Sequence, residues 1–173
     1  MEFHTDREEA LYTTLKRVLQ NHIATHRLGY YQTLAACVPA LGYVLYVMSE
    51  SWEEAPGLIE TTVAELQQRT HTRALDTLPP LSPFHDYAFH TDLSAEYQEL
   101  GTALTTLLTT SGIEHNMSVA ATWRVCVSLL ADVLAMAIHD AEQTPAEVES
   151  YITSLREQLA ALMRMWAEEG EVC

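Results

Sequence analysis

The sequence predicts an all-α fold, a compact bundle of about six helices. Apolar residues recur at spacings of three and four along most of the chain, which is the period of an amphipathic helix. Glycine and proline are scarce, six of each in 173 residues, so few turns interrupt long elements. With 48% hydrophobic residues, a chain of this length is expected to form one domain spanning residues 1–173.

The first two predicted helices differ in how they are patterned. The first covers residues 6–28, because Thr5 and Glu8 form a capping box in front of it. The second covers residues 30–49 and is apolar almost all round, which is typical of a helix in the middle of a bundle. Pro39 is expected to kink or split it, since proline lacks the backbone donor and clashes with the preceding turn.

The third predicted helix leads into the long loop of the chain. Ser51 and Glu54 form a second capping box, with Pro56 as an alternative first turn, and the helix runs to about residue 75. Three prolines then make residues 78–91 a loop between two halves of three helices each. Neither half is expected to bury its most apolar helix alone, which favours a single domain.

The last three predicted helices have clear ends. The fourth covers residues 93–110 and is expected to stop at Ser111–Gly112. The fifth, residues 117–141, is long and strongly apolar. The sixth covers residues 145–169, because the segment 144–147 places threonine at the cap, proline at the first helical position and glutamate at the third.

The charge of the chain limits its partners. It carries 24 Asp and Glu against nine Lys and Arg, a formal net charge of −15, and Lys16 is its single lysine. No Lys or Arg occurs between Arg73 and Arg124. Nucleic acid and anionic membrane surfaces repel such a chain unless its few arginines gather on one face. Neither is therefore expected as a direct partner, and a protein with a basic surface is expected instead.

Two acidic stretches and one loop supply the candidate interaction residues. Residues 50–65 and 140–149 hold several carboxylates and no Lys or Arg. The loop at residues 84–92 gathers two His, two Asp and three aromatics, which suits a binding surface or metal ligands, unless the aromatics only anchor the loop to the bundle. The candidates are Glu50, Glu53, Glu54, Glu60, Glu65, Phe84, His85, Asp86, Tyr87, His90, Asp140, Glu142, Glu147 and Glu149.

A divalent metal site is an alternative that rests on two histidines. His22 and His26 are four residues apart, which places both imidazoles on one face of the first helix. Further ligands would come from elsewhere, with His115 and His139 as candidates. The simpler interpretation is that both histidines face solvent near the end of the helix, where a positive charge complements the helix dipole.

A polar stripe crosses the apolar fifth helix. Arg124, Ser128, Asp132, His139 and Gln143 lie within one arc of its surface at about 100° per residue. If the stripe faces solvent, it is an ordinary exposed face. If it faces an internal cavity, its charged members are expected to have shifted pKa values. The sequence leaves both options open.

The cysteines and the apolar segments indicate a cytoplasmic protein. Cys37 and Cys126 lie inside apolar runs, as small core residues do, and no CxxC pair suggests a disulfide framework. The chain opens on an acidic, polar segment rather than on a signal peptide. Its longest apolar stretch, residues 34–48, is shorter than the roughly 20 residues that cross a bilayer.

These observations favour a non-enzymatic interaction protein, an adaptor or inhibitor that binds a basic protein surface. The chain has no glycine-rich phosphate loop, no GxSxG elbow and no HExxH motif, and no cofactor is expected. One alternative is a metal- or small-ligand-binding protein that uses His22 and His26 or the loop at residues 84–92. Another is an obligate homodimer of structural role, joined through the fourth or fifth helix.

Overall fold

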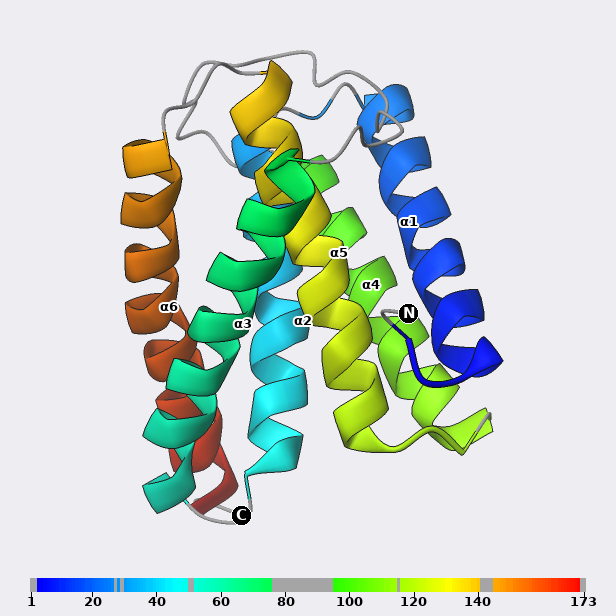
Figure 1. The fold of residues 1–173 in the computed structure, drawn as a ribbon. Coiled ribbons are helices and arrows are strands. Elements are labelled where there is room, and N and C mark those ends of the chain that lie inside the picture. The colour runs from blue at the N-terminus through cyan, green and yellow to red at the C-terminus, as the bar shows by residue number, and fades with distance from the viewer. Residues whose placement is uncertain are drawn as a thin grey trace.

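The computed structural model confirms the all-α prediction: within the part of the chain that it describes, every regular element is a helix (Figure 1). The structure describes residues 3–26, 28, 30–49, 52–75, 95–114, 116–140 and 145–171. Its elements are α1 Asp6–His26, α2 Tyr30–Met48, the short 3-10 helix η1 Trp52–Glu54, α3 Ala55–Leu75, α4 Ala95–Glu114, α5 Val119–Asp140 and α6 Pro145–Glu171.

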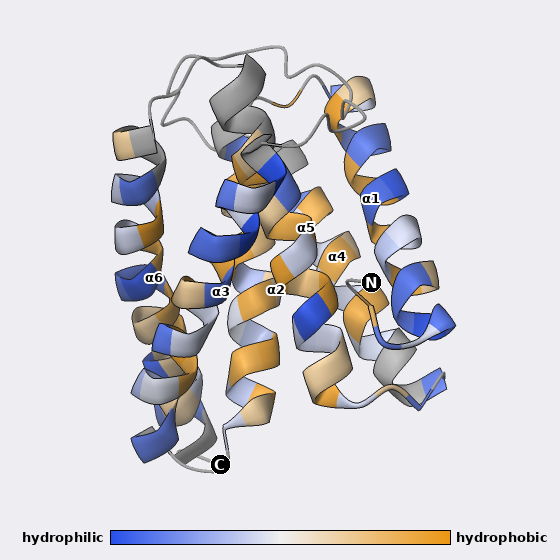
Figure 2. Cartoon of the chain, viewed as in Figure 1, coloured by the Kyte–Doolittle hydropathy of each residue, from blue (hydrophilic) through white to orange (hydrophobic). Residues whose placement is uncertain are grey.

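Helices α2 and α5 form the centre of the bundle. They pack against each other, while α1 and α4 cover one side and α3 and α6 cover the other (Figure 1). One buried apolar cluster draws residues from all six described α-helices, so the two predicted halves share a core. Figure 2 shows hydrophobic residues on the faces that the helices turn toward one another. None of the described helices combines the length and the apolar character that a bilayer crossing requires.

The capping box that predicts the first helix is present. The Glu8 backbone N–H donates to Thr5 Oγ1 at 3.3 Å, and the Thr5 N–H donates to Glu8 Oε2 at 2.9 Å. Helix α5 begins in a similar way, because the hydroxyl of Ser118 accepts the N–H of Ala121 at 3.2 Å. Local hydrogen bonding therefore fixes where these two helices start.

The predicted end of the fourth helix is wrong. Helix α4 continues through Ser111 and Gly112 to Glu114. The residue with a positive φ is Asn116, at 50°, in the short connection to α5. Asparagine tolerates this left-handed conformation better than most residues, so the chain reverses there and glycine remains inside the helix at a cost of about 1 kcal/mol.

Helices α2 and α6 each continue through a residue that often interrupts or ends a helix. Helix α2 is one continuous element with Pro39 inside it, so Pro39 does not split the helix, and the expected kink stays a prediction. Helix α6 passes through Gly170 and ends at Glu171. The predicted loop at residues 78–91 and the predicted cap at Ser51 lie outside the described residues.

Candidate functional site

Three helices meet along a line of polar side chains, here called the polar seam. Each helix contributes residues spaced by four, which therefore lie on one helical face. Nearly all of these side chains are buried or half-buried. The seam consists of Glu8, Tyr12 and Lys16 from α1, Glu65, Arg69 and Arg73 from α3, and Arg124, Ser128 and Asp132 from α5.

The contacts of the seam show which way the polar stripe on α5 faces. Its described members, Arg124, Ser128 and Asp132, contact α1 and α3 directly. The stripe therefore neither forms an exposed face nor lines an open cavity over this length, and both sequence-based options are replaced by a packed polar interface. The side chains of His139 and Gln143 lie outside the described residues.

Asp132 holds the centre of the seam. Its Oδ1 lies 2.8 Å from Nη1 of Arg73, and its Oδ2 lies 3.9 Å from Nζ of Lys16. The Tyr12 hydroxyl donates to the same carboxylate. Lys16 also lies over the ring of Tyr12, 5.7 Å from its centroid. Burial, and then the charge of Arg73, lower the pKa of Lys16 below its usual value.

Glu8 forms the lower part of the seam. Its side chain is fully buried, and Oε1 accepts from Nε of Arg124 at 2.8 Å. Oε2 accepts the backbone N–H groups of His4, at 2.6 Å, and of Thr5. Burial by itself raises the pKa of the Glu8 carboxyl, but the Arg124 hydrogen bond and charge, together with the two backbone donors, hold it below its usual value.

Helix α3 joins the seam through two arginines. Arg69 donates to the Ser128 hydroxyl at 2.6 Å and pairs with Glu65 Oε2 at 3.1 Å. Arg73 also donates to the backbone carbonyl of Ser128. The charged groups of the seam therefore pair with one another, which fixes the relative positions of α1, α3 and α5.

The seam holds a larger share of the chain's cations than of its carboxylates. It contains four of the nine Lys and Arg residues but only three of the 24 Asp and Glu residues. The remainder of the chain consequently carries 21 acidic residues against five basic ones. The formal net charge outside the seam is thus −16, one charge more negative than that of the whole chain.

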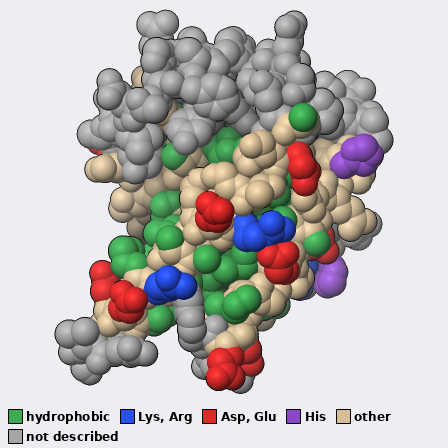
Figure 3. All heavy atoms as spheres, turned by 90° about the vertical axis from the view of Figure 1, so that its left-hand side faces the viewer, with side chains coloured by type: hydrophobic (Ala, Val, Ile, Leu, Met, Phe, Trp, Pro, Cys, Tyr) green, Lys and Arg blue, Asp and Glu red, His purple; other side chains and the backbone are tan. Residues whose placement is uncertain are grey.

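Helices α3 and α6, with η1, present the candidate interaction site, here called the acidic face (Figure 3). Among the described residues there, two arginines lie with the carboxylates, and Nη2 of Arg156 pairs with Glu60 at 3.1 Å while Arg164 is exposed. The acidic face comprises the exposed residues Glu53, Glu54, Glu60, Glu149, Glu157, Glu168 and Glu169.

The structure brings together some of the predicted interaction residues. Glu53, Glu54, Glu60 and Glu149 all lie on the acidic face, whereas Glu65 turns toward Arg69 in the seam. Asp140 and Glu147 lie in α5 and α6, but their side chains are outside the described part. Also outside it are Glu50, Phe84, His85, Asp86, Tyr87, His90 and Glu142.

The predicted histidine pair is present on one face of α1. The rings of His22 and His26 have centroids 5.6 Å apart. However, His22 Nδ1 lies 2.9 Å from the Val18 carbonyl oxygen, and His26 Nε2 lies 3.6 Å from Glu99 Oε2. Within the described residues no three His, Cys, Asp or Glu side chains are placed to hold a metal ion. Metal binding by this pair stays a prediction.

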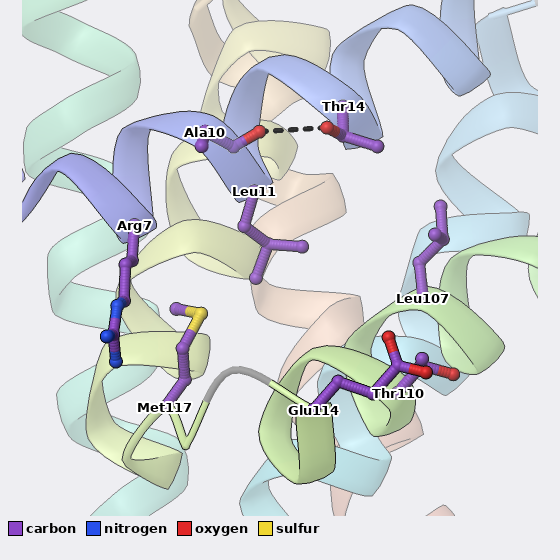
Figure 4. A pocket seen from close by; sticks show the side chains of 8 residues that line it. All are labelled: Arg7, Ala10, Leu11, Thr14, Leu107, Thr110, Glu114 and Met117. Atoms are coloured by element: carbon purple, nitrogen blue, oxygen red, sulfur yellow. Dashed lines mark hydrogen bonds between the residues drawn. The ribbon is translucent and has the colours of Figure 1, made fainter.

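Two surface cavities lie near the end of α4 and the start of α5. One, of about 220 Å³, lies between α1 and α4, with Leu11 in its wall and with Arg7 and Glu114 also lining it (Figure 4). The other is a groove of about 260 Å³ between α2, α4 and α5. Both are smaller than the roughly 300–1,000 Å³ of typical small-molecule sites.

The proposed dimer helices differ in their exposure. Helix α5 is covered by other helices of the same chain over most of residues 121–135. Helix α4 keeps an open face that includes Thr102 and Thr106, while the hydroxyls of Thr105 and Thr109 donate to carbonyls of their own helix. Of the two helices considered for a dimer interface, α4 is therefore the accessible one.

Comparison of the chain with protein-family models, with curated proteins and with solved structures finds no match in any of the three.

Proposed function

We propose that the protein is a non-enzymatic interaction protein, an adaptor or inhibitor, whose acidic face binds a cationic surface on a partner protein. The observation that carries this proposal is the separation of charge in the bundle. Four of the nine cations pair with carboxylates in the polar seam, whereas the acidic face presents exposed carboxylates in excess of its arginines.

The arrangement of the seam supports a structural rather than a catalytic role for its charged groups. Asp132 contacts Arg73, Lys16 and Tyr12, so its carboxylate is engaged by three side chains of the same chain. Glu8 is likewise enclosed by Arg124 and two backbone donors. Groups that are held in this way fix the positions of the helices. The partner would therefore bind to the acidic surface outside the seam.

The acidic face would act mainly on the rate and selectivity of association. A single exposed carboxylate contributes little to affinity, on the order of 0–1 kcal/mol, because water and salt screen it. Several carboxylates of one sign attract a cationic partner over a longer range and repel anionic ones. Such binding weakens as ionic strength rises.

The buried thiols support a proposed cytoplasmic location. Cys37 and Cys126 are free and buried in the core. Burial raises the pKa of the Cys37 thiol to about 12, and burial together with the neighbouring Cys37 raises that of Cys126 further. Both side chains therefore act as small apolar residues, with no described disulfide to require an oxidising compartment.

The test is capture of partners from the native host with a variant that lacks part of the acidic face. Glu53→Gln, Glu54→Gln and Glu157→Gln together remove three exposed carboxylates, none of which belongs to the seam. Proteins retained by the wild type at about 0.1 M salt are identified by mass spectrometry, and the capture is repeated at about 0.5 M. We expect basic partners whose retention falls with salt and with the triple substitution.

A matched control distinguishes an effect of the acidic face from an effect of the total charge. Asp6→Asn, Glu9→Gln and Glu99→Gln remove three exposed carboxylates from α1 and α4, two of them in a first helical turn as in the test variant. Retention by this control should equal that of the wild type. Partners that persist at high salt, or that both variants lose equally, would show that the acidic face does not direct binding.

A further inference from the structure

The groove between α2, α4 and α5 is an apolar surface that the chain leaves open. Within the described residues three large hydrophobic side chains are exposed, and two of them, Val47 at 47% and Val119 at 36%, line this groove. Its wall contains no charged residue and consists of Tyr43, Val44, Val47, Leu108, Thr109, Met117, Val119 and Thr122.

The size of the groove restricts what fits it. A volume of about 260 Å³ is below the range of a typical site for a cofactor or a drug-sized molecule, yet it suits one or two apolar side chains. Protein partners commonly insert a few aromatic or aliphatic side chains into such pockets, where most of the binding energy is concentrated. The groove is therefore sized for an anchoring residue of a partner protein.

The charged residues of the helices around the groove favour a cationic partner. Helix α2 contains no Asp, Glu, Lys or Arg, and α4 contains three Glu and no Lys or Arg. Among Lys and Arg, α5 contains only Arg124, which points to α1 and pairs with Glu8. An approaching cation thus meets no opposing Lys or Arg from the three helices that build the groove.

Carboxylates continue on both sides of the groove. On one side Met117, which lines the groove, also lines the neighbouring cavity, whose wall contains Glu114 and one cation, Arg7 of α1. On the other side Tyr43 packs edge-on against Trp166, with centroids 6.4 Å apart, and Glu169 follows less than one helical turn later on the acidic face. An apolar centre with acidic surroundings matches an amphipathic segment that carries cations beside its apolar residues.

We propose that this groove receives the apolar side chains of a basic amphipathic helix of the partner protein, and that the surrounding carboxylates receive its cations. The proposal rests on the function proposed above and specifies the chemistry of the partner. A second copy of this chain is the weaker occupant, because two copies of net charge −15 repel each other. Helix-in-groove binding of this kind places apolar anchors at spacings of three and four.

The experiment uses two synthetic peptides of about 18 residues. Both contain the same leucines, alanines and lysines. In one peptide the leucines lie on one helical face, and in the other they are scrambled around the helix. Affinity is measured by fluorescence anisotropy for the wild type and for three variants. These are Val47→Asn with Val119→Ser, the acidic-face triple substitution described above, and Met165→Gln, which alters an exposed hydrophobic residue of α6 outside the groove.

The expected result is that the wild type and Met165→Gln bind the amphipathic peptide at least about tenfold more tightly than the scrambled one, and that the groove variant loses this preference. If both peptides bind with equal affinity and the acidic-face substitutions weaken that affinity, the groove proposal is wrong but the proposed function is supported. A preference that survives in the groove variant also overturns the groove as its source.

Two further outcomes are decisive. If neither peptide binds at low salt, both the groove proposal and the electrostatic form of the proposed function are lost. If sedimentation shows a wild-type dimer that the Val47→Asn and Val119→Ser variant dissociates, the groove is occupied by a second copy, and the proposal of a basic helix is wrong. Thermal melting of the variant confirms that it remains folded, as expected for substitutions at exposed positions.

Discussion

Glu8 has two structural roles. It closes the capping box at the start of α1, and it pairs with Arg124 on α5 from a fully buried position. Its sequence context indicates only the first of these roles, because the partner in the second lies more than one hundred residues away. Removing one member of a buried ion pair is costly, since the other charge is left without compensation.

Glu8→Gln should therefore destabilise the protein in a pH-dependent way. At pH 7 we expect a loss of about 2–4 kcal/mol in the free energy of unfolding, measured with urea, because Arg124 loses its carboxylate. The pKa of Glu8 is lowered in the folded state, so its contribution is fully present above the unfolded value of about 4.3 and is lost as pH falls through the folded value. The difference from wild type should shrink toward about pH 3.

The neighbouring Glu9 supplies the control for this prediction. It is exposed and lies in the same helical turn, and Glu9→Gln should change the free energy of unfolding by less than about 0.5 kcal/mol at either pH. If Glu8→Gln behaves as Glu9→Gln does, or if its cost does not change with pH, the ion pair with Arg124 does not stabilise the fold.

At the scale of the element, spacings of four build the seam. The stripe of α5 is visible in the sequence, because its polar residues interrupt an otherwise apolar helix. The matching residues of α1 and α3 are equally regular, at positions 8, 12 and 16 and at 65, 69 and 73. The sequence does not single out these residues, because α1 and α3 carry polar residues on several faces. Only the packing of the helices distinguishes the buried polar residues from the exposed ones.

Helix starts were easier to predict than helix ends. The capping box at Thr5 depends on hydrogen bonds between residues three apart, so a short segment determines it. The end of α4 depends on where the chain can turn toward α5, and the turn lies at Asn116 rather than at Gly112. Glycine weakens a helix without ending it, so the sequence placed that boundary too early.

Two helical glycines should respond differently to alanine. A Cβ at Gly57 would contact nothing within 4 Å, so Gly57→Ala should stabilise α3 by about 0.5–1 kcal/mol through backbone propensity. A Cβ at Gly42 would lie 3.3 Å from Leu162 and 3.4 Å from Trp166. Urea unfolding of Gly42→Ala should show a smaller gain, or a loss, because α2 and α6 must separate slightly to admit the methyl group.

This pair of variants reports on the contact between α2 and α6. Both substitutions remove the same backbone freedom from the unfolded chain, so the difference between their effects isolates the packing. An equal gain in both variants would mean that α6 does not approach α2 at Gly42 as closely as the structure shows.

At the scale of the whole molecule, the location of the charges matters more than their sum. The sequence predicts a strongly acidic chain of helices, and its acidic stretch from 50 to 65 contains Glu53, Glu54 and Glu60 of the acidic face. It does not indicate that Glu65 is drawn inward or that four cations gather in one seam. Those facts require the relative positions of α1, α3 and α5.

The apolar groove is likewise a property of the assembled bundle. Val47 is the last residue but one of α2, and Val119 is the first residue of α5, 72 positions further along the chain. Neither differs in the sequence from the many buried valines near it. Exposure of both beside one groove appears only once the helices have packed, which is why sequence patterns did not predict this surface.

Site-specific photocrosslinking in the native host tests the central claim, that the acidic face receives a protein partner, most directly. p-Benzoylphenylalanine is placed at position 53 or 157 on the acidic face, and at position 9 or 99 on α1 or α4 as controls of similar exposure. The account predicts crosslinks to the same basic protein from positions 53 and 157 and none from positions 9 and 99. Crosslinks from positions 9 and 99 alone, or equally from all four, would contradict it.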